Sequence, residues 1–154
     1  EQILADGDAD MIGYGRSLLC DSDIALKVAN DEPIRECLNC NKGCVDAIQG
    51  RRYISCVLNA ENGDESTIFI KEADAKKRVA IVGAGIAGLE AARVAGLKGH
   101  EVDVYEKEAV IGGQINIAAV PPRKDEMLRI NQYYDEVMKE YNIENLQDII
   151  GRTK

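Results

Sequence analysis

A glycine-rich turn, GAGIAG at residues 83–88, constrains the fold of this chain more than any other feature. An apolar, β-branched run precedes it at 79–82, a helical pattern follows at 89–97, and a second strand pattern follows at 102–105. Strand, glycine turn, helix and strand in this order are typical of a Rossmann unit that binds a dinucleotide. The glycine hexamer alone would be a weak match, so the flanking pattern carries the prediction.

Each glycine of the turn has a role in such a unit. Gly83 permits the tight turn, Gly85 lets the backbone approach a pyrophosphate, and Gly88 lets the helix pack closely on the strand. Free N–H groups at the start of the helix then face the phosphates. Glu106 ends the second expected strand and lies 23 residues after Gly83, close to the spacing of a ribose-binding carboxylate. A glycine turn without a ligand is the alternative.

A second glycine pair bears on the choice between FAD and a nicotinamide nucleotide, which bind through the same kind of turn. The segment IGGQ at 111–114 follows the second expected strand closely. Its Gly113 and Gln114 resemble the positions that FAD enzymes of the glutathione-reductase type place beside the flavin pyrophosphate. This favours FAD, and an ordinary glycine loop is the alternative.

Four of the five cysteines, Cys37, Cys40, Cys44 and Cys56, are separated by two, three and eleven residues. Four thiolates suit either a [4Fe–4S] cluster or a structural zinc ion. Zinc sites usually present two close pairs of ligands, whereas three close ligands and one remote ligand commonly wrap a cubane, so the spacing favours iron–sulfur. Cys20 stands outside the pattern and is expected to be a packed thiol.

The first segment, residues 1–30, has a short apolar strand signal at 9–13, a turn at Tyr14, Gly15 and Arg16, and then a helical pattern through Val28. It predicts a strand, a phosphate-sized turn and a helix. The next segment, 31–75, is rich in Asn and Gly and has little apolar surface to bury. A metal centre would organise it by supplying binding free energy as folding free energy.

The last segment, 76–154, contains the glycine turn and, from about Lys124 to Glu140, an amphipathic helical pattern. These three segments belong to three structural units, none with enough residues to be complete. The sequence also opens at Glu1 without a methionine. We therefore expect a piece of a larger protein.

Charge and composition exclude several classes of partner. The net charge of −8, from 27 acidic and 19 basic residues, argues against nucleic acid, because phosphate neutralisation needs a basic face. No run approaches the roughly 18 apolar residues that span a membrane. The clustered cysteines and the lack of a secretory segment point to reduced thiols, which predicts a cytoplasmic location.

Taken in chain order, the Gly15–Arg16 turn, the four cysteines and the glycine hexamer resemble the 2,4-dienoyl-CoA reductase and trimethylamine dehydrogenase family of NADH:flavin oxidoreductases. The resemblance implies an α/β chain in three parts. These are the end of an FMN-binding TIM barrel resembling old yellow enzyme (1–30), a [4Fe–4S] segment (31–75) and the incomplete start of a Rossmann-like FAD/NAD(P) domain (76–154).

The resemblance also implies residue roles and a reaction. Gly15 and Arg16 would hold the FMN phosphate at the end of the last barrel strand, where anion sites of this fold commonly lie. Electrons would pass from NAD(P)H through FAD and [4Fe–4S] to FMN, to reduce an enoate or enoyl-type C=C bond; the same machinery run backwards oxidises amines. One departure is Ala60 after Asn59, where the family usually shows Asn-Pro.

No catalytic residue is expected within the chain. Its expected partners are a small-molecule substrate and the remainder of the same enzyme, and a homo-oligomer is left open. Two other interpretations remain: an electron-input subunit like the small subunit of glutamate synthase, and a non-catalytic metal-binding or electron-transfer module.

Overall fold

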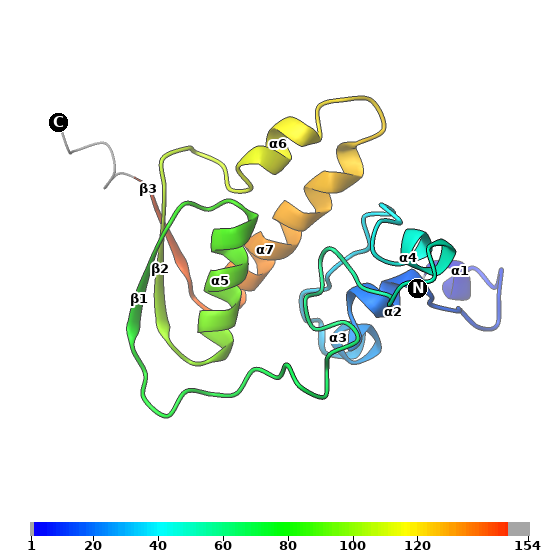
Figure 1. Cartoon of the computed structure of the whole chain (residues 1–154), viewed down its shortest axis with the longest axis horizontal. Coiled ribbons are helices and arrows are strands. Elements are labelled where there is room, and N and C mark those ends of the chain that lie inside the picture. Colours follow the sequence, from blue (N-terminus) through cyan, green and yellow to red (C-terminus); the bar gives the residue numbers. More distant parts are fainter. Residues whose placement is uncertain (1, 148–154) are drawn as a thin grey trace.

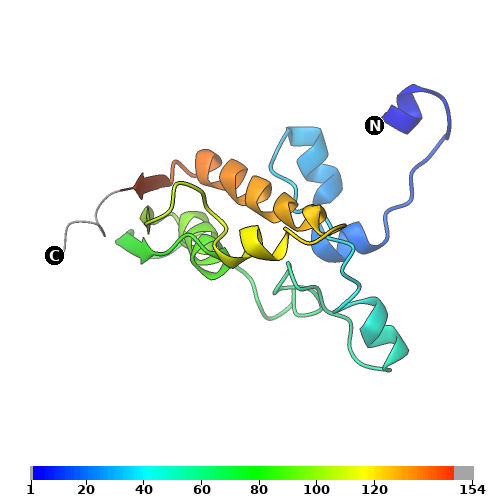
Figure 2. The same cartoon turned by 90° about the horizontal axis from the view of Figure 1, so that it is seen from above.

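The computed structural model describes residues 2–147, without the side chains of 144–147. Their helices and strands, in chain order, are α1 (Gln2–Ala5), α2 (Arg16–Cys20), α3 (Ile24–Asn30), α4 (Val45–Gln49), β1 (Arg78–Val82), α5 (Ile86–Leu97), β2 (Glu101–Glu106), α6 (Gln114–Ala118), the 3-10 helix η1 (Asp125–Leu128), α7 (Arg129–Glu140) and β3 (Glu144–Gln147). The short helices α1 to α4 lie at one end of the molecule and the sheet at the other, with α7 between them (Figure 1). The view from above shows the same separation (Figure 2).

The three strands form a parallel sheet in the order β1-β2-β3. Arg78 pairs with Glu101 at the start of β1, and Asp103 pairs with Glu144 at the start of β3. Helix α5 connects the parallel strands β1 and β2 and packs on both of them and on α7. This is the βαβ unit that the glycine turn predicts, and it brings the carboxyl ends of β1 and β2 to one edge of the sheet.

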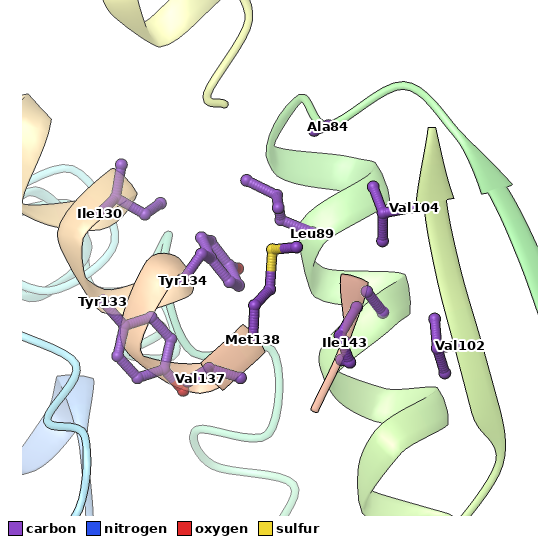
Figure 3. Packing of buried hydrophobic residues seen from close by; sticks show 11 residues of the cluster. Ala84, Leu89, Val102, Val104, Ile130, Tyr133, Tyr134, Val137, Met138 and Ile143 are labelled. Carbon is purple, nitrogen blue, oxygen red and sulfur yellow. The ribbon is translucent and has the colours of Figure 1, made fainter. Parts of the chain in front are cut away.

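The core lies between the sheet, α5 and α7 (Figure 3). Val102 and Val104 of β2 and Leu89 of α5 are buried members of this core. The buried residues of α7 recur at helical spacing along one face: Ile130, Tyr133, Tyr134, Val137 and Met138. The amphipathic pattern in the sequence is thus confirmed, although its first turn is the 3-10 helix η1.

One predicted strand is absent, and one observed strand was not predicted. The strand expected at 9–13 does not form, and residues 2–30 contain three short helices and no strand. A strand needs a hydrogen-bonded neighbour, and within residues 2–147 the first strand begins only at Arg78. The strand β3 was missed because its sequence signal is weak. The end of a TIM barrel is therefore not shown by these residues.

The middle segment has little regular structure, because α4 is the only helix or strand between residues 31 and 77. Its few buried side chains include Arg35, Ala47 and Asn59. Asn59 donates from Nδ2 to the carbonyl oxygen of Leu19 at 3.1 Å and so ties this segment to α2. No helix in the described part of the chain has the length and apolar character needed to cross a membrane.

Candidate cofactor-binding site

The glycine turn closes the gap between β1 and α5. Gly83 has φ +103°, a left-handed backbone that only glycine adopts readily, and its N–H donates to the carbonyl oxygen of Tyr105 at 2.7 Å. At Gly88 a Cβ atom would collide with the carbonyl oxygen of Gly83. These two glycines are therefore required by the fold of the turn itself.

Gly85 differs, because nothing in the described chain requires glycine there. It precedes the first residue of α5 with φ −74° and ψ 173°, which any residue adopts. A Cβ atom built on it would meet no heavy atom within 4 Å. The open space beside Gly85 lies at the start of a twelve-residue helix, whose free N–H groups favour a phosphate. This arrangement fits a dinucleotide pyrophosphate.

Glu106 lies where the sequence predicts, at the end of β2 beside the turn. Its side chain is 8% exposed, Oε1 accepts from the N–H of Glu108 at 3.1 Å, and Oε2 accepts from the N–H of Ala84 at 2.7 Å. The N–H groups of Glu108 and Ala84 hold the pKa of Glu106 below its ordinary value. An ionised carboxylate has about four acceptor positions, so two backbone bonds leave capacity for a ribose hydroxyl.

The second glycine pair lies directly against the turn. The N–H of Gly112 donates to the carbonyl oxygen of Ala84 at 2.7 Å, and Gly112 forms a parallel bridge with Gly85. A Cβ atom at Gly113 would lie 3.3 Å from the Cα atom of Gly85. Gln114 follows as the first residue of α6. The structure thus brings both glycine segments to the same edge of the sheet.

The four cysteines of the predicted cluster site line one small cavity together with Arg16. Cys40 is exposed, and Cys37, Cys44 and Cys56 are half-buried. None of the four forms a disulfide. Across the described side chains, no three His, Cys, Asp or Glu residues converge closely enough to hold a single metal ion.

A backbone contact brings the remote fourth cysteine to the other three. The N–H of Ser55 donates to the carbonyl oxygen of Gly43 at 2.7 Å, and a Cβ atom at Gly43 would lie 2.5 Å from the carbonyl oxygen of Ser55. Glycine at position 43 therefore permits the close approach of two segments whose neighbours are Cys44 and Cys56. The contact explains how an eleven-residue gap still yields one site.

The thiol of Cys56 has a lowered pKa. Interaction with the buried Cys20 thiol is the largest cause, the N–H groups of Leu58 and Asn59 add to it, and burial opposes it. The same contact and burial raise the pKa of Cys20. Metal and cluster ligands must be deprotonated, so the donor set suits a soft metal centre.

The cysteine loop contacts both flanking parts of the chain. Arg129, at the start of α7, donates from Nη1 to the carbonyl oxygen of Cys37 at 3.3 Å, and Asn39 donates from Nδ2 to Oε2 of Glu126 at 3.0 Å. On the other side, Arg16 donates from Nη1 to Oδ1 of Asn41 at 2.6 Å. The candidate cluster site therefore lies between α2 and the Rossmann unit.

Comparison with known proteins gives consistent results. Residues 81–135 match the family described as an NAD(P)-binding Rossmann-like domain. Bilirubin reductase of Mediterraneibacter gnavus is 53% identical over 146 residues, which cover 94% of this chain and 23% of that relative. These similarities support the resemblance to the NADH:flavin oxidoreductases.

Solved structures extend the likeness to the fold of nearly the whole chain. A 2-naphthoyl-CoA reductase in complex with 2-naphthoyl-CoA has a TM-score of 0.90 and 29% identity, over 96% of this chain and 23% of that one. Histamine dehydrogenase from Rhizobium sp. 4-9 has a TM-score of 0.82 and 26% identity, over 96% and 24%. The chain thus spans about a quarter of the length of these relatives.

In the structure, the predicted site residues form two groups. Gly83, Gly85, Gly88, Glu106, Gly113 and Gln114 meet at one edge of the sheet, and Arg16 joins the four cysteines at their cavity. Gly15 is exposed and directly precedes α2.

Sequence reasoning missed an asparagine pair behind the second glycine segment. Asn131 donates from Nδ2 to Oδ1 of Asn116 at 2.6 Å, and Asn116 donates from Nδ2 to the carbonyl oxygen of Ile111 at 2.9 Å. A Cβ atom at Gly112 would overlap the amide of Asn131. Both asparagines are half-buried, and because they lie on different helices, α6 and α7, the local sequence carries no signal for their contact.

Proposed function

We propose that this chain is the electron-transfer junction of an NAD(P)H-dependent flavin and iron–sulfur oxidoreductase that reduces an enoate or enoyl-type C=C bond. The observation that carries the proposal is the cavity lined by Cys37, Cys40, Cys44 and Cys56, which lies beside a dinucleotide-binding unit. Thiolates are the ligands of iron–sulfur clusters. The division into barrel end (1–30), cluster segment (31–75) and Rossmann start (76–154) belongs to the same proposal.

The spacing of the thiols supports a cluster over a single zinc ion. Zinc sites usually present two close pairs of ligands. Here Cys37, Cys40 and Cys44 are close in sequence and Cys56 is remote, yet all four line one cavity. A cubane has four separate irons, each with its own thiolate, and three close ligands with one remote ligand commonly wrap it.

The chain's own residues would hold three redox groups. The four cysteines would ligate the [4Fe–4S] cluster, and the two glycine segments with Glu106 would bind the FAD pyrophosphate and ribose. Gly15 and Arg16 would hold the FMN phosphate; the exposed guanidinium of Arg16 already lies at the cysteine cavity. When bound, these groups would supply hydride acceptance from NAD(P)H and single-electron transfer toward FMN.

Support for the N-terminal part comes from the extent of the match. The likeness to bilirubin reductase covers 94% of this chain, so most of residues 1–30 takes part in it. A free metal-binding module would not need that segment. Reduction is favoured because the more similar relatives are named reductases.

A second candidate reaction is amine oxidation, which the fold likeness to histamine dehydrogenase favours. It would use the same cluster and flavin ligands in this chain. The two reactions differ in the substrate pocket that the proposal places outside this chain, so they are separated by assay of the whole enzyme with an enoate acceptor or with an amine donor.

The test is anaerobic purification of the enzyme from the full gene, followed by extraction of its flavins and assay with NADH, NADPH and an enoate. The proposal predicts both FAD and FMN in the extract, with a cluster of four irons and four sulfides. It also predicts enoate-dependent oxidation of one of the two nucleotides. A preparation with a single kind of flavin, or with zinc in place of iron, would contradict it.

A further inference from the structure

Arg35 is a buried cation between the cysteine segment and the Rossmann unit. Its side chain is 7% exposed. Its backbone N–H donates to Oδ2 of Asp21 at 3.0 Å, and Nη1 donates to the carbonyl oxygen of Cys20 at 3.5 Å. The guanidinium carbon lies 5.5 Å from the ring centroid of Tyr133, a buried residue of α7. The position of the guanidinium is therefore fixed by contacts from both units.

The charge of Arg35 lacks a direct counterion among the described side chains. No carboxylate forms an ion pair with its guanidinium there, and its Nε atom is buried without a hydrogen-bond partner. The nearby carboxylate of Asp21 is paired with Lys27 at 2.8 Å. Buried charges are ordinarily paired because the interior solvates them poorly. An unpaired buried guanidinium therefore calls for negative charge supplied by something else.

A cluster bound at the candidate cluster site would supply this negative charge. Arg35 precedes Cys37 by two residues, and Cys37 lines the cysteine cavity. Nη1 of Arg35 donates to the carbonyl oxygen of Cys20, whose neighbour Leu19 lines the same cavity. Four thiolates around an iron–sulfur cube carry net negative charge, and that charge grows when the cluster is reduced.

We propose that Arg35 is a positioning residue whose fixed positive charge raises the reduction potential of the [4Fe–4S] cluster held by Cys37, Cys40, Cys44 and Cys56. The inference rests on the proposed function. Net charge and burial are main determinants of cluster potential, and a charge in a low-dielectric interior acts strongly because water does not screen it. Reduction adds one electron and breaks no bond, and the guanidinium remains protonated throughout.

Lys42 provides a matched control for this charge. It lies within the cysteine loop between Cys40 and Cys44, but it is exposed. Solvent and salt screen an exposed charge. Removal of this positive charge should therefore change the cluster potential much less than removal of the charge of Arg35, although both residues are near the same ligands in sequence.

The experiment uses the anaerobically purified full-length holoenzyme and its variants Arg35→Gln, Arg35→Met, Arg35→Lys and Lys42→Met. Iron and acid-labile sulfide are measured first, and the cluster is then titrated potentiometrically with detection by electron paramagnetic resonance. For the two neutral variants at Arg35 we expect at least a tenfold shift of the one-electron equilibrium toward the oxidised cluster, which corresponds to about 59 mV. Arg35→Lys should remain near wild type, and Lys42→Met should shift by less than half as much.

Unchanged potentials in the loaded neutral variants would overturn the role of Arg35. An equal shift in Lys42→Met would also overturn it. A third contrary result would be that neither neutral variant loads a cluster while Arg35→Lys does, because the charge of Arg35 would then be needed for cluster assembly and not for the cluster potential. Wild-type enzyme without iron would instead refute the proposed function, so the two failures are distinguishable.

Discussion

Substitution of Gly85 by alanine should weaken dinucleotide binding without changing the stability of the fold. The backbone at Gly85 is ordinary, with φ −74°, and a Cβ atom would meet nothing within 4 Å. Alanine lowers the conformational entropy of the unfolded chain, which stabilises the folded state by about 0.4–1 kcal/mol. The position just before a helix prefers glycine to alanine, and this preference offsets part of that stabilisation. We expect the free energy of unfolding of the flavin-free protein to change by less than about 0.5 kcal/mol.

Dinucleotide binding should change much more. The added methyl group would occupy the space through which the pyrophosphate approaches the backbone, and overpacking of this kind costs about 1–3 kcal/mol. Since about 1.4 kcal/mol is a factor of ten in affinity, FAD should bind roughly 5- to 150-fold more weakly. The flavin-free enzyme would be titrated with FAD by fluorescence, and its thermal unfolding would be followed in parallel.

Gly88→Ala is the matched control. Its Cβ atom would collide with the carbonyl oxygen of Gly83 inside the protein, so we expect destabilisation of the flavin-free protein by about 1–3 kcal/mol as well as weaker FAD binding. The reasoning is refuted if Gly85→Ala binds FAD as tightly as wild type, or if it destabilises the flavin-free protein as much as Gly88→Ala does.

Three further predictions concern charged residues. Arg16→Gln should lower the FMN content of the purified enzyme while FAD content is unchanged, as extraction and chromatography would show; equal loss of both flavins would argue against a phosphate-specific role. Arg93 is buried and donates to both carboxylate oxygens of Glu90, at 2.7 and 2.8 Å. Arg93→Met should therefore lower the free energy of unfolding by about 2 kcal/mol, measured by thermal unfolding. Lys139→Met breaks an exposed pair with Asp135 and should lower it by less than about 0.5 kcal/mol. Burial opposes ionisation of Glu90, but the hydrogen bond and charge of Arg93 hold the pKa of Glu90 below its ordinary value. The stabilisation that the ionised Glu90 gives the folded state should therefore be complete above about pH 4.3 and lost as the pH falls through the lower folded pKa. A pH series of unfolding temperatures should show this loss in wild type and not in Arg93→Met.

Local pattern was sufficient to predict the Rossmann unit. The alternation at 102–105 and the β-branched run at 79–82 correspond to β2 and β1, and the glycine turn lies between β1 and α5 as expected. Each of these elements has a periodic pattern of apolar residues along its own stretch of sequence, which a single sequence displays. The contact of Gly112 and Gly113 with the turn follows because both segments leave parallel strands at the same edge.

Features that depend on distant contacts could not be predicted in this way. The strand signal at 9–13 has no partner strand among residues 2–30, so propensity alone did not produce a strand. The burial of Arg35 depends on Tyr133, almost a hundred residues later, and the approach of Cys56 depends on the contact between Gly43 and Ser55. Nothing in the local sequence around an arginine or a serine indicates such contacts.

The ligand set of the candidate cluster is tested most directly by iron and acid-labile sulfide analysis of two cysteine variants of the anaerobically purified full-length enzyme. Cys40 is exposed, so Cys40→Ser should leave the fold intact and yet lower iron and sulfide well below wild type. Cys20→Ser should retain both, because Cys20 is a buried neighbour of Cys56 and not a proposed ligand. Full iron content in Cys40→Ser, or stoichiometric zinc in the wild-type enzyme, would contradict the account.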